Sequence, residues 1–217
     1  MDPSRGWYNE TVLNLLFSSP LEFVIAFGGL ILSLSCHEFA HAWVADFLGD
    51  PTPRMQGRVT LNPLAHLDPL GTVALLLVRF GWGKPVEIDP FNLKNPIRDS
   101  ALVALAGPTM NLIIAGLIAV VVRLVSLPEF VLISLVDVAA INVVLAVFNL
   151  VPVYPLDGSK IVLPLLPRTL GLEYEEFMHK FGLFLMLALI VPWYNGASPI
   201  SLLIFPVIQF VTGLLFG

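Results

Sequence analysis

Two histidines and a glutamate form the strongest chemical pattern in the sequence. They occur as His37-Glu38-Phe39-Ala40-His41, inside an apolar stretch long enough to form a helix. Residues four apart lie about 40° apart around a helix and one turn along it, so both imidazoles can reach one metal ion. Glu38 follows the first histidine and can take a proton from water held by that ion. The pattern therefore predicts a metal site that activates water.

A third protein ligand must come from elsewhere in the chain. A catalytic zinc ion usually has three protein ligands and one open position. Asp157, in Leu156-Asp157-Gly158, is one candidate, and Asp68 and His66 are competing candidates. A set of two histidines and one carboxylate could also hold iron or cobalt. The residues alone leave both the third ligand and the metal open.

The composition indicates a membrane protein. Of the 217 residues, 57% are hydrophobic and 12% are charged, whereas soluble chains have about 45–50% apolar and about 25% charged residues. So few charges cannot cover a water-facing surface, and the net charge of −5 argues against a nucleic-acid partner. The single Cys36 excludes a disulfide scaffold and a thiolate metal cluster. We therefore expect the chain to lie in a lipid bilayer.

Five stretches are expected to cross the bilayer, since a spanning helix needs about 20 apolar residues. The first three are Phe23–Ala45, Ala101–Val122 and Phe130–Val151. Two more are expected between about Tyr174 and Gly217, divided at Pro192–Pro199. The first span contains both histidines of the candidate metal site.

The segment between the first two spans has a different pattern. Arg58–Asn62 and Val86–Asp89 alternate polar and apolar residues, which is typical of half-buried strands. Leu70–Phe80 is apolar but too short to cross, so we interpret it as a re-entrant segment. The expected fold is an all-α polytopic membrane protein, with about five transmembrane helices and a re-entrant segment flanked by a small β-hairpin. We expect one domain over residues 1–217, with a catalytic core at about 20–165 and C-terminal helices at about 173–217.

The placement of lysine and arginine predicts the orientation, because cytoplasmic loops are enriched in both. With the N-terminus outside, Arg5 and Arg123 lie outside. The other nine lie on the cytoplasmic side: Arg54, Arg58, Arg79, Lys84, Lys94, Arg98, Lys160, Arg168 and Lys180. The same orientation puts Asp157 and the histidine-bearing half of the first span on that side, which favours Asp157 as the third ligand.

Four ordered motifs resemble one known family. They are HEFAH (37–41), NPLAHLDPLGT (62–72), AGPTMN (106–111) and NLVPVYPLDG (149–158). Over roughly residues 20–165 the chain resembles the site-2 protease family of zinc intramembrane metalloproteases. The resemblance implies one Zn2+ per chain, bound by His37, His41 and Asp157. It also implies that Glu38 is the general base and that Asn149 stabilises the oxyanion.

The resemblance further implies an intramembrane endopeptidase, which we expect in the cell membrane. The placement of lysine and arginine predicts that its active site lies toward the cytoplasm. Its expected substrate is a single-span membrane protein, cut within or near the transmembrane segment. One alternative is a non-proteolytic metal-binding scaffold or transporter of the same fold. A second is a membrane metalloprotease that cuts soluble or peripheral peptides.

Several further polar and small residues have expected roles outside the chemistry. Gly107, Pro108 and Asn111 are expected to serve helix packing, because small residues let membrane helices approach closely. Asn142 is expected to form an interhelical hydrogen bond, although it competes with Asn149 for the oxyanion role. His66 is expected to anchor the re-entrant loop, with a place at the mouth of the active site as the alternative.

Overall fold

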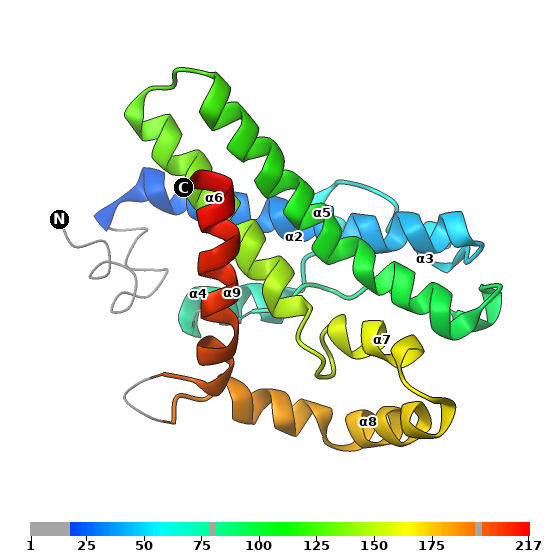
Figure 1. Ribbon diagram of the computed structural model, residues 1–217. Coiled ribbons are helices and arrows are strands. Elements are labelled where there is room, and N and C mark those ends of the chain that lie inside the picture. The colour runs from blue at the N-terminus through cyan, green and yellow to red at the C-terminus, as the bar shows by residue number, and fades with distance from the viewer. Residues whose placement is uncertain (1–17, 79–80, 194–196) are drawn as a thin grey trace.

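Three long helices form the centre of the computed structural model, which describes residues 18–78, 81–193 and 197–217 (Figure 1). They are α2 (Pro20–Leu48), α5 (Pro96–Leu124) and α6 (Glu129–Asn149), and α5 packs against both others. The remaining described helices are α3 (Thr52–Met55), α4 (Pro69–Val78), α7 (Gly158–Val162), α8 (Arg168–Ile190) and α9 (Pro199–Phe216), with 3-10 turns η1 (Pro63–Ala65), η2 (Pro90–Asn92) and η3 (Leu163–Leu165).

Small residues lie where the three central helices meet. The fully or almost fully buried ones are Ala42 and Ala45 on α2, Ala104 and Ala115 on α5, and Ala139 and Ala146 on α6. Short side chains let the helix backbones approach closely, which is the usual way that membrane helices pack. The bundle is therefore tight at the level of the candidate metal site.

Four of the described helices are long and apolar enough to cross a membrane: α2, α5, α6 and α9. The expectation of five spans is therefore wrong for the part of the chain that the structure describes. The fourth expected span corresponds to α8, a helix of 23 residues. In Figure 1, α8 runs along the lower edge of the molecule, at a steep angle to α9.

Charge explains why α8 differs from the other long helices. Arg168, Glu173, Glu175, Glu176 and Lys180 all lie in its N-terminal part. Each charged side chain at the centre of a bilayer costs several kcal/mol or more, about 2.5–3.5 for arginine or lysine on the insertion scale. The apolar run from Phe181 onward is long only because it continues past Pro192–Pro199 into α9. Part of that break, residues 194–196, lies outside the described residues.

The predicted β-hairpin is also wrong. Neither Arg58–Asn62 nor Val86–Asp89 forms a strand, and the pairing seen in this part of the described chain is an isolated antiparallel bridge between Leu67 and Gly83. The apolar stretch between them forms α4 as far as Val78, and residues 79 and 80 lie outside the described residues. At about 1.5 Å per residue this ten-residue helix is about 15 Å long, half the hydrocarbon thickness. Its re-entry into the bilayer stays a prediction.

The side chain of a buried arginine, and not backbone pairing between two strands, connects these loop segments. Arg58 is 3% exposed, and its guanidinium donates hydrogen bonds to the carbonyl oxygens of Ala65 and Lys84. The backbone N–H of Lys84 also donates to the carbonyl of His66 at 2.8 Å. Arg58 therefore points inward and joins two loop segments, whereas the alternating pattern placed it on the solvent-exposed face of a sheet.

Asp50 joins the end of α2 to the segment that precedes α5. The residue is fully buried, and its Oδ1 accepts hydrogen bonds from the Thr52 hydroxyl at 2.6 Å and the Asn92 amide at 2.9 Å. Its Oδ2 accepts from the backbone N–H of Asp89 at 2.8 Å. Burial raises the pKa of this carboxyl, but the hydrogen bonds from Thr52, Asn92 and Asp89 outweigh burial and hold the pKa below its ordinary value of 3.8.

Replacing Asp50 by asparagine should destabilise the chain by about 1–3 kcal/mol at neutral pH, because an amide NH2 would face buried donors. The ionised carboxylate stabilises the fold above pH 3.8, and this contribution is lost as the pH falls through the lowered pKa of the folded chain. Thermal unfolding in detergent should therefore show a gap between wild type and variant that shrinks on acidification. Asp46→Asn, which breaks a pair with the exposed Arg54, is the control with a small expected effect. A gap that does not change with pH would contradict this role.

Candidate metal centre

Three side-chain atoms converge between α2 and the loop that follows α6. The Nε2 atoms of His37 and His41 lie 3.0 Å apart. Asp157 Oδ2 lies 3.1 Å from His37 Nε2 and 3.3 Å from His41 Nε2. Ligand atoms held about 2.0–2.1 Å from one tetrahedral ion are separated by about 3.3 Å. The three atoms therefore fit a single zinc ion, and these residues form the candidate metal cluster found in the described chain.

The other nitrogen of each histidine has an oxygen acceptor. His37 Nδ1 lies 2.5 Å from Oδ1 of Asn111, and His41 Nδ1 lies 2.7 Å from the carbonyl oxygen of Val103. Because both acceptors are oxygens without protons, each Nδ1 carries the proton and each Nε2 keeps its lone pair. Metal-binding histidines are typically oriented by such bonds. Both imidazoles are thus in the tautomer that a metal requires.

Asn111 belongs to a buried polar network that joins all three central helices. Its Nδ2 donates to Oδ1 of Asn142 at 2.8 Å, and Asn142 Nδ2 donates to the Ser33 hydroxyl at 2.8 Å. Both asparagines are 0% exposed. The expected interhelical hydrogen bond of Asn142 is therefore confirmed. Asn111 was expected to serve packing, but it also contacts a candidate ligand.

Replacing Asn111 by alanine should weaken zinc binding about 10–100-fold, the usual cost of losing the residue that orients a metal ligand. The His37 imidazole would lose its acceptor and could turn away from the ion. Zinc affinity of the purified chain, measured by competition with a chelator, checks the effect. Thr109→Ala on the same helix is the matched control, since the Thr109 hydroxyl bonds to the Leu105 carbonyl of its own helix. Equal affinities for the two variants would contradict the orienting role.

Gly107 on α5 faces the ligand atoms directly. A Cβ placed on this residue would lie 2.5 Å from both Nε2 atoms. Gly107 therefore leaves the space in which a metal ion and its ligands can lie, a role beyond the packing expected from sequence.

Gly158 has a comparable role beside the third ligand. A Cβ at this position would clash with the carbonyl oxygens of Leu150 and Val151. The loop can therefore pass closely under the end of α6 and present Asp157 at the start of α7.

The far side of the same loop is packed against α8. The Tyr174 hydroxyl donates to the Pro152 carbonyl at 3.0 Å, and Gly182 lies against Tyr154. Leu156, next to the candidate ligand, belongs to a buried apolar cluster with Met186 of α8. The C-terminal helices therefore support the loop that carries Asp157.

The competing third ligands lie elsewhere. Asp68 Oδ1 accepts a hydrogen bond from the Gly71 backbone N–H at 2.8 Å, at the start of α4. His66 is fully buried, and its Nε2 donates to the Thr60 carbonyl at 2.7 Å. Burial lowers the pKa of His66, and the nearby Arg58 lowers it further. Both residues hold the loop together, as the first interpretation of His66 predicts, and neither belongs to the metal cluster.

The two residues expected to act on the substrate are both partly exposed. Glu38 is next to His37 on α2. Burial lowers the pKa values of Arg58 and His66, and the negative charge of Glu38 opposes that lowering. Asn149 is the last residue of α6, and its Nδ2 donates to the Leu145 carbonyl at 2.9 Å. The roles of Glu38 as base and Asn149 as oxyanion donor stay predictions.

Comparisons with known proteins agree with the geometry. The sequence profile described as Peptidase family M50 matches residues 126–191. A Bacillus subtilis protein named "Putative zinc metalloprotease YwhC" is 37% identical over 175 residues, which cover 75% of this chain and 78% of the relative. A Mycobacterium tuberculosis protein named "Putative zinc metalloprotease Rip2" is 33% identical over 198 residues, covering 86% of this chain and 74% of the relative. No solved structure matches significantly.

The relatives and the metal cluster point to the same chemistry. Both relatives are named as zinc metalloproteases, and the three converging ligand atoms of this chain suit zinc. Four described helices are apolar enough to cross a membrane, as in a multi-pass membrane protein. The chain therefore belongs to peptidase family M50, to which the site-2 proteases are assigned, and is a zinc metalloprotease.

Proposed function

We propose that this chain is an intramembrane endopeptidase, which hydrolyses a peptide bond within or near the transmembrane segment of a single-span membrane protein. One observation carries the proposal: two of the three candidate ligands lie inside a helix that is apolar enough to span a membrane. At about 1.5 Å per residue, His41 and His37 lie about 10 and 16 Å before the last residue of α2. This depth supports a substrate bond close to, or inside, the hydrocarbon layer.

The proposed roles follow from the chemistry of the side chains. Zinc would be held by His37, His41 and Asp157. When bound, it lowers the pKa of its water molecule to about 7 and polarises a carbonyl group. Glu38 would accept the proton of the attacking water and return it to the leaving amine nitrogen. Asn149 would turn its amide from the Leu145 carbonyl to the developing oxyanion and donate a hydrogen bond there.

We further propose that the site opens toward the cytoplasm. If α2, α5 and α6 each cross the bilayer, residues 49–95 and residues 150–198 lie on the same side of it. These segments contain eight of the eleven lysine and arginine residues, and Arg98, in the first turn of α5, lies next to them. That asymmetry supports a cytoplasmic location for both segments, in a cell membrane.

The experiment that tests the proposal is cleavage in liposomes. The full chain is reconstituted with a panel of single-span proteins, with zinc present or removed by a chelator, and the products are identified by mass spectrometry. We expect zinc-dependent cuts within the transmembrane segment or within a few residues of its cytoplasmic end. Cuts confined to soluble peptides would overturn the intramembrane part of the proposal. Full zinc occupancy without cleavage of any substrate in the panel would favour the scaffold or transporter.

Asn149→Ala tests the oxyanion role separately. Removal of one such donor typically lowers kcat about 10²–10³-fold. We expect that decrease with zinc content and KM almost unchanged, because the observed hydrogen bond of Asn149 is to its own helix. An unchanged kcat would show that the oxyanion is stabilised by another group.

A further inference from the structure

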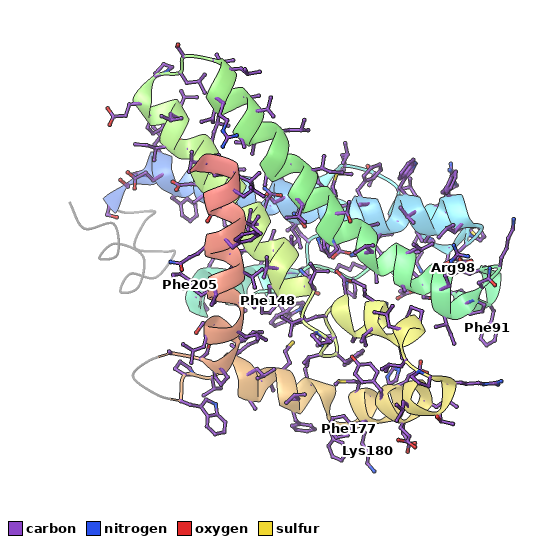
Figure 2. The ribbon with its side chains drawn as sticks, in the orientation of Figure 1. Phe91, Arg98, Phe148, Phe177, Lys180 and Phe205 are labelled. Carbon is purple, nitrogen blue, oxygen red and sulfur yellow. The ribbon has the colours of Figure 1, made fainter. Side chains whose placement is uncertain are left out.

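A second site lies beside the start of α5, away from the metal ligands. A cavity of about 900 Å³ opens between the N-terminal end of α5, the turn η3 and the N-terminal part of α8. None of the three candidate zinc ligands lines it. In Figure 2, Arg98 marks the end of α5 on the side of the molecule where α8 begins.

The cavity concentrates positive charge in a chain that is acidic as a whole. Arg98, Lys160 and Arg168 line it together with a single carboxylate, that of Glu175, while the chain has a net charge of −5. All three cationic residues are exposed. In the described part of the chain, their side chains form no ion pair or hydrogen bond. They are therefore available to bind an anion.

The depth of the cavity matches the headgroup layer of a bilayer. The expected span Ala101–Val122 begins three residues after Arg98, which therefore lies about 4.5 Å before it along the helix. The lining also includes Ile97 and Leu172, which are 61% and 60% exposed. A small free anion would leave these two side chains in water, whereas a lipid would cover them with its acyl chains.

We propose that this cavity binds the phosphate group of an anionic phospholipid. Basic pockets at the cytoplasmic end of membrane helices suit such headgroups. Lys160 lies on α7 only three residues after Asp157, so the bound lipid would also hold the short helix that follows the third zinc ligand. The proposal depends on the membrane location of the chain and not on its protease activity.

The test measures lipid binding to the full chain directly. Native mass spectrometry in a non-ionic detergent would compare phosphatidylglycerol with phosphatidylcholine of the same acyl chains, and inorganic phosphate would serve as the free anion. The cavity variant combines Arg98→Gln, Lys160→Gln and Arg168→Gln. The matched control removes the same number of arginine and lysine charges elsewhere, in Arg54→Gln, Lys84→Gln and Arg123→Gln.

We expect wild type and control to bind phosphatidylglycerol at least tenfold more tightly than phosphatidylcholine, and the cavity variant to lose that preference. Inorganic phosphate at millimolar concentration should not displace the lipid. Equal binding of the two lipids by wild type would overturn the proposal, and this comparison needs no variant to fold. Equal loss in variant and control would also overturn it, as would displacement by inorganic phosphate, which would identify a free-phosphate site.

Discussion

Alanine in place of Gly107 should abolish zinc binding and proteolysis together. The added Cβ would lie 2.5 Å from Nε2 of both His37 and His41, far inside van der Waals contact. Neither α2 nor α5 can retreat easily, because buried small residues hold them together. Zinc content, measured by elemental analysis of the purified chain, should fall from about one per chain to almost none.

Gly116→Ala on the same helix is the matched control for this experiment. Apart from the neighbouring backbone of its own helix, no atom lies within 4 Å of the position that its Cβ would occupy. It should keep full zinc content and activity and gain slightly in helix stability, since alanine is favoured over glycine in helices by about 1 kcal/mol. If Gly107→Ala bound zinc as well as Gly116→Ala, the ligand geometry described above would be wrong.

Glutamine in place of Glu38 should separate metal binding from catalysis. A general base typically contributes about 10²–10⁴-fold to the rate, and glutamine cannot accept the proton. Glu38 is outside the cluster of three ligand atoms, so zinc content should stay at about one per chain. Rates from the liposome cleavage assay and zinc content from the same preparation provide the comparison.

Two further variants complete the Glu38 experiment. Glu176→Gln, an exposed residue of α8, should behave as wild type, whereas Asp157→Ala should lose zinc and activity together. Loss of zinc in Glu38→Gln would identify Glu38 as a ligand. Wild-type activity in that variant would place the base on another residue.

The chemistry was easier to predict from the sequence than the architecture around it. The spacing of His37 and His41 is local, because one helical turn brings both side chains to one ion. The three central spans are equally local, since each depends on the length of an apolar run. Asp157 was only favoured by the expected orientation and was selected over Asp68 by the family resemblance, because 120 residues separate it from His37 and nothing local links the two.

The errors come from features that depend on tertiary contacts. The alternation in Arg58–Asn62 indicated a strand, but the guanidinium of Arg58 is buried and bonds to loop carbonyls. Gly107 and Asn111 were assigned to packing because their distance from the histidines depends on how α5 crosses α2. Two general rules could have suggested that Asn111 contacts a metal ligand. A metal-binding histidine needs a hydrogen-bond acceptor for its other ring nitrogen, and a polar side chain inside a membrane span needs a hydrogen-bond partner.

The long separation between the ligands has a consequence for biosynthesis. A growing chain that has emerged only as far as α5 contains Glu38 and both histidines, but Asp157 has not yet been made. The loop that carries Asp157 is further supported by α8, which is synthesised later still. An unfinished or truncated chain therefore holds an incomplete ligand set in the membrane. Proteolytic competence would therefore arise only after the loop that carries Asp157 and the helix that supports it have been synthesised.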